Sequence, residues 1–134
     1  MEYSMKQVSQ LTGLTAHTLR YYEKEGLLPD VRRTCTGIRR FSQEDLDGLG
    51  LICCLKSTGM SIKQIREFVA LSVKGDCTLK QRCDMLIAHK QDVEEQMRQM
   101  QKHIEKVTHK IAYFTGKYEK LQSEKDEKRV VTSA

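Results

Sequence analysis

Four arginines lie close together in the first half of this chain of 134 residues and could bind phosphate groups. Arg32 and Arg33 precede the tripeptide Cys-Thr-Gly, and Arg39 and Arg40 follow it after one further residue. Asp30 is the only acidic residue in the stretch PDVRRTCTGIRRF. A concentrated basic patch on a chain with a net charge of +5 indicates a polyanionic partner such as nucleic acid.

The five cysteines are the second set of side chains that could do chemistry. Because their number is odd, they cannot all pair in intrachain disulfides, and the first ten residues, MEYSMKQVSQ, do not resemble a secretory signal. We therefore expect reduced thiols in the cytoplasm. Cys53 and Cys54 are adjacent, and a thiolate at either position could attack an electrophile. Neighbours on a helix differ by about 100°, so one thiol can be buried while the other is exposed.

The composition disfavours several classes of function. No apolar run approaches the roughly 18 residues of a membrane span, so we expect no membrane partner. The chain has four histidines, no glycine-rich phosphate loop and no defined cluster of carboxylates, which argues against an enzyme and gives no reason to expect a cofactor. A pure coiled-coil adaptor would leave the arginine patch unexplained.

The elements that position these side chains change character near Gly75. Before it, frequent glycines separate short amphipathic segments, and Ser42 with Asp45 and Ser61 with Gln64 have the spacing of capping boxes. The residues around Cys-Thr-Gly read as a hairpin. We expect helices at 5–11, 15–25, 42–57 and 62–72, and strands at 28–34 and 38–41.

The first two expected helices, with a Gly-Leu turn between them, form a helix-turn-helix pattern. In the second helix Leu19 anchors the core, whereas the exposed positions carry side chains that can bind DNA. Tyr21 and Tyr22 are adjacent and cannot both face inward, and we expect Tyr22 to be the core residue. The exposed positions are His17, Thr18, Arg20 and Tyr21.

The second half has a heptad pattern and no proline, which predicts one long helix in a coiled coil. Thr78 with Gln81 is a plausible capping box at its start. Such a helix cannot bury its apolar stripe alone, so we expect a second copy as its partner. Residues 123–134 are expected to be a disordered tail. The stripe consists of Leu86, Lys90, Val93, Met97, Met100, Ile104, Val107, Ile111, Phe114, Tyr118 and Leu121.

The first half resembles the winged helix-turn-helix of the MerR family of transcriptional regulators. The resemblance covers residues 2–72 and rests above all on TLRYYEKEGLLP, with GIRRF about ten residues later. It implies a mainly α fold, with a winged helix-turn-helix DNA-binding domain at 1–75 and an antiparallel coiled-coil dimerisation helix at 76–122.

The resemblance also implies which residues meet DNA. Thr15, His17 and Thr18 would lie nearest the bases, and Arg20 and Tyr21 nearest the phosphates. Arg39 matches the arginine of the family's wing. Further phosphate contacts, which position a protein without reading sequence, are expected from the rest of the patch. These are Arg32, Arg33 and Arg40, and for Arg40 a solvated charge is an equal alternative.

Members of this family are homodimers that bind palindromes in promoters with an overlong spacer. The activated dimer bends and untwists the DNA and so realigns the promoter elements for RNA polymerase. The resemblance therefore implies three partners: double-stranded promoter DNA, a second copy of the chain and RNA polymerase.

The segment around the adjacent cysteines is similar to the aldehyde- and nitrosative-stress branch of the family, the AdhR/NmlR type. Alignment through the following STGMSI implies that Cys54 is the reactive thiol, whereas helix geometry alone does not choose between Cys53 and Cys54. A metal sensor is disfavoured. Metal-sensing members of the family carry further cysteines in a loop after the dimerisation helix, whereas no cysteine follows Cys83 here. His103 and His109, which lie within the heptad region, cannot converge on one ion within a chain. A different small ligand, or a repressor without an inducer, stays open.

Overall fold

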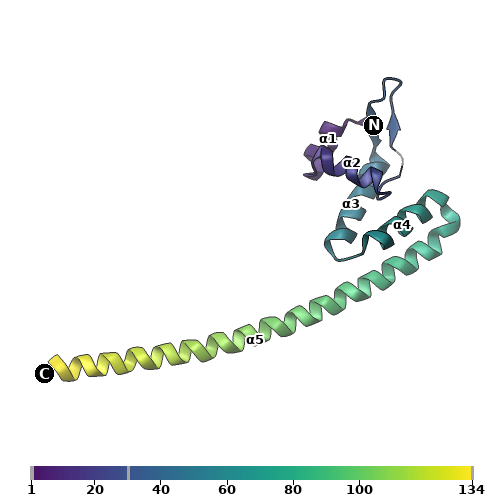
Figure 1. The fold of residues 1–134 in the computed structure, drawn as a ribbon. Coiled ribbons are helices and arrows are strands. Elements are labelled where there is room, and N and C mark those ends of the chain that lie inside the picture. The colour runs from purple at the N-terminus through teal and green to yellow at the C-terminus, as the bar shows by residue number, and fades with distance from the viewer. Residues whose placement is uncertain (1, 30, 134) are drawn as a thin grey trace. The chain divides into compact units, whose positions relative to one another are not determined.

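The computed structural model describes residues 2–29 and 31–133, without the side chains of 130–133. The chain divides into two units, Met1–Val93 and Glu94–Ala134. Helices dominate both, in agreement with the predicted fold class (Figure 1). In chain order the elements are β1 (Glu2–Tyr3), α1 (Met5–Thr12), α2 (Ala16–Lys24), β2 (Arg32–Arg33), β3 (Arg39–Ser42), α3 (Gln43–Ser57), α4 (Ile62–Lys74), the 3₁₀ turn η1 (Asp76–Thr78) and α5 (Leu79–Ser133).

The helix-turn-helix is built by α1 and α2, and a hydroxyl side chain begins each helix. The Ser4 hydroxyl accepts a hydrogen bond from the Gln7 backbone N–H, while the Gln7 side chain accepts one from the Ser4 N–H. Thr15 caps α2 by accepting from the Thr18 N–H at 3.1 Å. Gly13 ends α1 with φ of 77°, a left-handed conformation that favours glycine. These local signals explain why the sequence predicted this motif.

The first unit also contains a three-stranded antiparallel sheet in the order β1-β3-β2. Arg32 pairs with Arg40 across the hairpin, and Glu2 pairs with Ser42 on the other side of β3. The predicted hairpin is thus confirmed, with its first strand shorter than expected and its second shifted by one residue. The strand β1 was not predicted, because a two-residue element leaves no period in the sequence.

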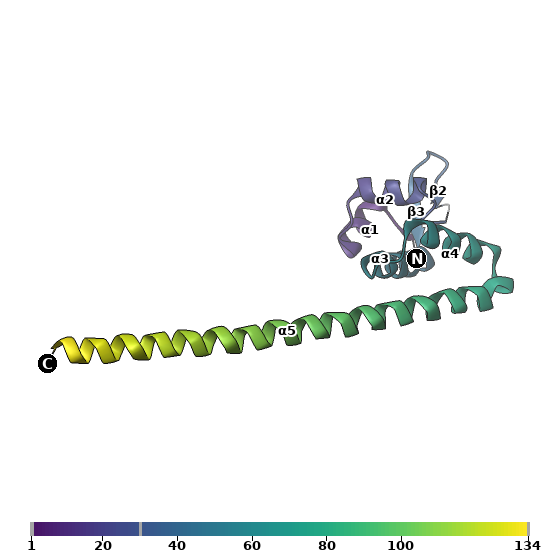
Figure 2. The ribbon, with the colours of Figure 1, turned by 60° about the horizontal axis from the view of Figure 1, so that its bottom comes forward.

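The core of the first unit joins α1, α2, α3 and α4, which gather around the sheet (Figure 2). Both predicted capping boxes form, at Ser42 with Asp45 and at Ser61 with Gln64. They set the starts of α3 and α4 at the expected residues. The most deeply buried side chains are Val8, Leu19, Leu27, Leu49 and Ile65.

The start of α5 differs from the predicted capping box. The Thr78 side chain is buried, and its hydroxyl hydrogen-bonds to the carbonyl oxygens of Leu71, at 2.6 Å, and Gly75, at 2.8 Å. Arg82 then donates from Nε to Thr78 Oγ1 and from Nη2 to the Gly75 carbonyl oxygen. Thr78 therefore closes the turn after α4 instead of capping α5 with Gln81, because η1 brings its hydroxyl onto carbonyl groups of the preceding helix.

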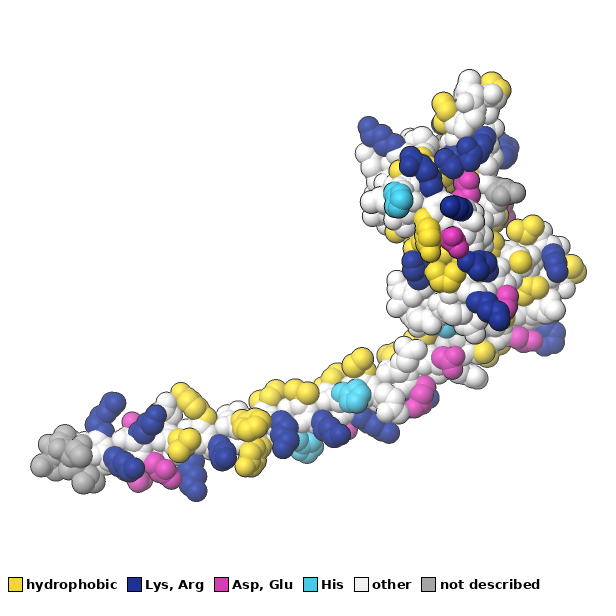
Figure 3. All heavy atoms as spheres, viewed as in Figure 1, with side chains coloured by type: hydrophobic (Ala, Val, Ile, Leu, Met, Phe, Trp, Pro, Cys, Tyr) yellow, Lys and Arg dark blue, Asp and Glu magenta, His cyan; other side chains and the backbone are white. Residues whose placement is uncertain are grey.

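The second unit is the continuation of α5 alone, and its apolar stripe is exposed (Figure 3). The helix runs to Ser133, so residues 123–133 are helical where the sequence predicted a disordered tail; residue 134 lies outside the described residues. The segment contains neither glycine nor proline after Gly116, and nothing interrupts its backbone hydrogen bonds. The exposed stripe consists of Met97, Met100, Ile104, Val107, Ile111, Phe114, Tyr118 and Leu121.

Candidate nucleic-acid interface

The outer face of α2 carries side chains free to meet a ligand. His17 and Arg20 are exposed, and Thr18 is half-buried. Thr15 has a different task, since its hydroxyl accepts from the Thr18 N–H and lies 2.9 Å from the Thr18 hydroxyl. The Thr15 hydroxyl thus caps the helix, and its expected contact with bases stays a prediction, as do those of His17 and Thr18.

The two adjacent tyrosines of α2 separate as predicted. Tyr22 is 4% exposed and belongs to the core, whereas Tyr21 is 44% exposed. The Tyr22 hydroxyl accepts a hydrogen bond from Lys56 Nζ at 3.3 Å, and the same ammonium lies 4.8 Å from the centre of the ring. Tyr22 therefore joins α2 to α3, and Tyr21 stays on the surface beside Arg20.

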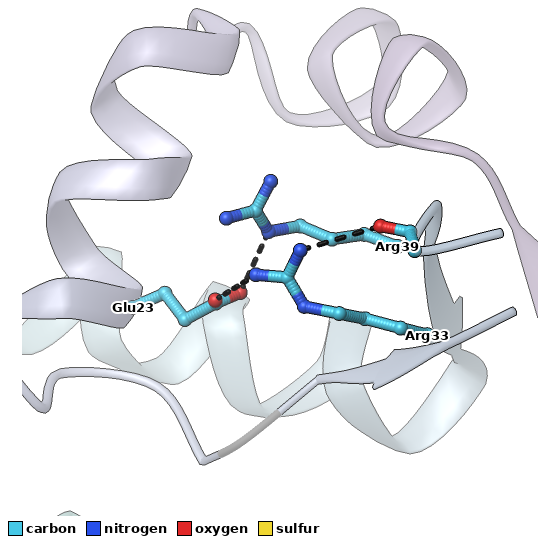
Figure 4. Close-up of polar contacts among 4 residues, drawn as sticks. Glu23, Arg33 and Arg39 are labelled. Atoms are coloured by element: carbon cyan, nitrogen blue, oxygen red, sulfur yellow. Dashed lines mark hydrogen bonds and ion pairs between the residues drawn. The ribbon is translucent and has the colours of Figure 1, made fainter. Parts of the chain in front are cut away.

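The hairpin of β2 and β3 is tied to α2 by one carboxylate, that of Glu23 (Figure 4). Arg39 donates from Nε to Glu23 Oε2 at 3.1 Å, and Arg33 donates from Nη2 to Glu23 Oε1 at 3.2 Å. A second donor of Arg33, Nη1, reaches the Gly37 carbonyl oxygen at 3.3 Å. One acidic side chain in the last full turn of α2 thus fixes two arginines of the wing.

These contacts give the wing arginines different capacities. Among the described residues, Arg39 bonds Glu23 through Nε alone, so its two terminal nitrogens stay available for a phosphate (Figure 4). Arg33, in contrast, uses both of its Nη atoms, one with Glu23 and one with the Gly37 carbonyl oxygen. Arg32 pairs with Glu2 on β1 and is the most exposed of the set, with 81% of its side chain accessible. Arg40 is half-buried and forms no ion pair in the described part of the chain.

Lys and Arg side chains gather over the part of the unit formed by α2 and the hairpin (Figure 3). The sequence pattern indicated these cations but not the anions that hold them, Glu2 and Glu23. Glu23 stands inside the quoted YYEKEG string, yet nothing in its spacing shows that it faces the wing. Only the fold brings it to residues 10 and 16 positions later in the chain.

The adjacent cysteines of α3 are placed differently. Cys53 is half-buried and packs against the core, and burial raises the pKa of its thiol, an effect that the nearby Lys56 ammonium partly opposes. Cys54 is exposed. The expected separation of the two thiols is therefore present, and exposure favours Cys54 as the accessible one.

The remaining thiols and histidines form no common site. Cys35, Cys77 and Cys83 are free and exposed. In the part of the chain that the structure describes, no group of three or more metal-ligating side chains comes together. No helix within the described ranges is both long and apolar enough to span a membrane.

Comparison with known proteins agrees with the winged helix-turn-helix geometry. Residues 3–71 match the family described as "MerR HTH family regulatory protein", and residues 46–110 match "MerR, DNA binding". An uncharacterized HTH-type transcriptional regulator of Haemophilus influenzae is 37% identical over 114 residues, which are 85% of this chain and 84% of that protein. The chain belongs to the MerR family of DNA-binding transcriptional regulators.

Two further comparisons bear on function. The regulator AdhR of Bacillus subtilis is 40% identical over 88 residues, 66% of this chain and 63% of AdhR. The crystal structure of HiNmlR, a MerR family regulator lacking the sensor domain, bound to promoter DNA, superposes with a TM-score of 0.78 at 36% identity, covering 86% of this chain and 91% of that one. The predicted family is thereby confirmed. The predicted contact residues and the role of the thiols stay predictions.

Proposed function

We propose that this MerR-family protein is a homodimer that binds double-stranded promoter DNA through α2 and the wing. The observation that carries the proposal is the joining of α2 and β3 by Glu23, which leaves the terminal nitrogens of Arg39 available beside the exposed face of α2. A helix enters the major groove with its N-terminal side chains against the bases, and flanking cations hold phosphates. HiNmlR, bound to promoter DNA, supports this assignment. The proposed contacts are His17, Thr18, Arg20, Tyr21, Arg32, Arg39 and Arg40, with Arg33 and Thr15 supporting them.

The dimer forms through α5 in this proposal. Its stripe is exposed from Met97 to Leu121, and apolar residues that alternate by three and four positions are buried by a second helix of the same pattern. An antiparallel pair places one DNA-binding unit at each end. The DNA-binding part is residues 1–75, and the dimerisation part is residues 76–122.

The regulatory step is a change in the shape of the promoter. The dimer bends and untwists the DNA between its two units, so that RNA polymerase in the cytoplasm can engage both promoter elements. Bending a DNA site of about 20–30 base pairs costs on the order of 1–6 kcal/mol. An effector therefore needs only to shift a balance of that size between two dimer shapes.

The effector acts on Cys54, whose thiol is exposed at the end of α3. A Cys54 thiolate adds to the carbonyl carbon of a reactive aldehyde and forms a carbon–sulfur bond. The carbonyl oxygen takes a proton from water, which gives a hemithioacetal without any oxidant or reductant. The similarity to AdhR supports this choice of chemistry.

The experiment is transcription by RNA polymerase from the promoter region of the protein's own gene, before and after a reactive aldehyde. Wild type, Cys54→Ser and Cys53→Ser are compared, and binding of each to the same DNA is measured by a mobility shift. Activation that is lost only in Cys54→Ser supports the thiol switch. Equal activation in all three overturns it, and activation by a metal ion or another ligand, or constant repression, would replace it.

A further inference from the structure

We infer that His89 is a positioning residue that links the end of α3, through Thr58, to α5 and carries a change at Cys54 into the dimerisation helix. The inference deepens the proposed function and rests on its assignment of Cys54. Its basis is a chain of hydrogen bonds that runs from the Cys54 carbonyl oxygen to the imidazole ring of His89.

The hydrogen bonds centre on the hydroxyl of Thr58, the residue that ends α3. Thr58 Oγ1 lies 2.7 Å from the Cys54 carbonyl oxygen and 2.7 Å from His89 Nε2. The backbone N–H of Thr58 also donates to the Cys54 carbonyl oxygen, at 3.0 Å. Cys54 is therefore held by two bonds from the same residue that contacts α5.

The direction of each bond follows from the number of protons. A threonine hydroxyl has a single hydrogen, and the Cys54 carbonyl oxygen can only accept. The Thr58 hydroxyl hydrogen therefore points to the carbonyl oxygens of Cys54 and, at 3.3 Å, Leu55, which leaves its oxygen to accept from His89. We therefore assign the tautomer with a hydrogen on Nε2, so that the donors run in one sequence from His89 to Thr58 to Cys54.

The packing beside this chain makes it a connection between helices. Leu86, one turn before His89 on the same side of α5, packs against the core. His89 itself is half-buried, and Val93 is the last residue of the first unit. Among the hydrogen bonds of the described residues, the His89–Thr58 bond alone joins α5 to the turn between α3 and α4.

The consequence for Cys54 is mechanical. Its carbonyl lies in the last turn of α3, and its side chain is exposed. We expect a group added to the thiol to displace that turn, whose carbonyl is held by Thr58. A shift of the turn therefore reaches His89 and changes how α5 leaves the first unit.

The first test observes His89 directly and does not depend on the natural effector. Full-length wild type and Cys54→Ser are compared by NMR, before and after treatment with iodoacetamide, through the ring nitrogen and hydrogen signals of their histidines. Iodoacetamide forms a carbon–sulfur bond and releases iodide, and mass spectrometry confirms the adduct.

We expect the free proteins to show a hydrogen on His89 Nε2. Alkylation should shift that signal in wild type and leave it in place in Cys54→Ser, while the signals of His103 and His109 stay unchanged in both. A His89 signal that does not shift when Cys54 is alkylated overturns the inference.

The second test uses function. Thr58→Val keeps the shape of the side chain but removes the hydroxyl, and His89→Phe removes the donor. Each should reduce the ratio of activated to basal transcription at least about threefold, measured against the variant's own basal level. Thr58→Ser and His89→Gln keep the donors and should restore the ratio, and His109→Phe is the matched control on the outer face of α5.

The two hypotheses fail in distinguishable ways. Wild type that responds to aldehyde, with Thr58→Val and His89→Phe responding equally well, overturns the role of His89 and leaves the thiol switch in place. Wild type without any response overturns the thiol switch, and the histidine signals then still decide whether the end of α3 is linked to α5.

Discussion

The carboxylate of Glu23 receives the Nε hydrogen of Arg39 at 3.1 Å, and both side chains are mostly buried, with 18% and 21% exposed. This ion pair joins the last full turn of α2 to β3, the central strand of the sheet. Because both surfaces that would touch DNA meet at Glu23, their relative position is set by an acidic residue that holds two arginines but would not itself bind a polyanion.

Replacing Glu23 should weaken both folding and DNA binding. Glu23→Ala removes two ion pairs and leaves Arg33 and Arg39 without their acceptor, and we expect a loss of about 1–3 kcal/mol in the free energy of unfolding. Urea denaturation measures it, and fluorescence anisotropy measures DNA affinity. The control is Asp84→Ala, which breaks an exposed pair with Lys80 and should cost less than about 0.5 kcal/mol. Equal effects of the two variants would contradict a special role for Glu23.

Arg39 should contribute one phosphate contact. Arg39→Ala is expected to weaken binding to unrelated DNA sequences by a similar factor and to reduce the slope of log affinity against log salt by about one. Titrations at several salt concentrations give that slope. Arg98→Ala removes a paired arginine from α5 and should leave the slope unchanged. A slope unaffected by Arg39→Ala would show that its terminal nitrogens do not meet a phosphate.

Thr15 should behave as a helix cap more than as a base contact. Thr15→Ala removes the acceptor for the Thr18 N–H and is expected to cost about 1 kcal/mol of stability, whereas Thr15→Ser keeps it. Thermal unfolding separates the two variants. If Thr15→Ser kept stability but changed the preferred DNA sequence, Thr15 would also be a base contact, as the family resemblance implies.

The exposed stripe of α5 should be the dimer interface. Ile104 lies near its middle, and Ile104→Lys would bury an unpaired ammonium at a cost of about 3–5 kcal/mol. Analytical ultracentrifugation should then show monomers at concentrations where wild type is dimeric. Gln99→Lys adds the same charge outside the stripe and should stay dimeric. A dimeric Ile104→Lys protein would place the interface elsewhere.

Cys53 in the folded protein should become reactive toward alkylating agents at a higher pH than Cys53 in the unfolded chain. Because burial raises the pKa of this thiol, folded Cys53 holds its proton to higher pH than the same residue in the unfolded chain. Its contribution to stability is present below the pKa of the unfolded thiol and is lost as pH rises through the folded value. Rates of alkylation in Cys54→Ser, folded and in denaturant, measure the shift by mass spectrometry. Coincident pH profiles would contradict it.

The sequence by itself determined the elements whose signals are local. Capping residues such as Ser42 and Ser61 compete for backbone N–H groups within one turn, so they mark helix starts wherever the chain goes. Heptad spacing marks the stripe of α5 in the same way. The rule that two neighbours cannot share one helix face predicted that only one of Tyr21 and Tyr22 is buried, and the expected one, Tyr22, is. The family followed from such local strings.

The tertiary structure decided everything that depends on residues far apart in the chain. β1 exists only because β3 offers it an edge, and the Thr78 hydroxyl bonds the carbonyl oxygens of Leu71 in α4 and of Gly75 instead of capping α5. Glu23 meets Arg39, and His89 meets Thr58, across 16 and 31 positions of the chain. No periodicity encodes such meetings, because they result from the packing of whole elements and not from the preferences of neighbouring residues.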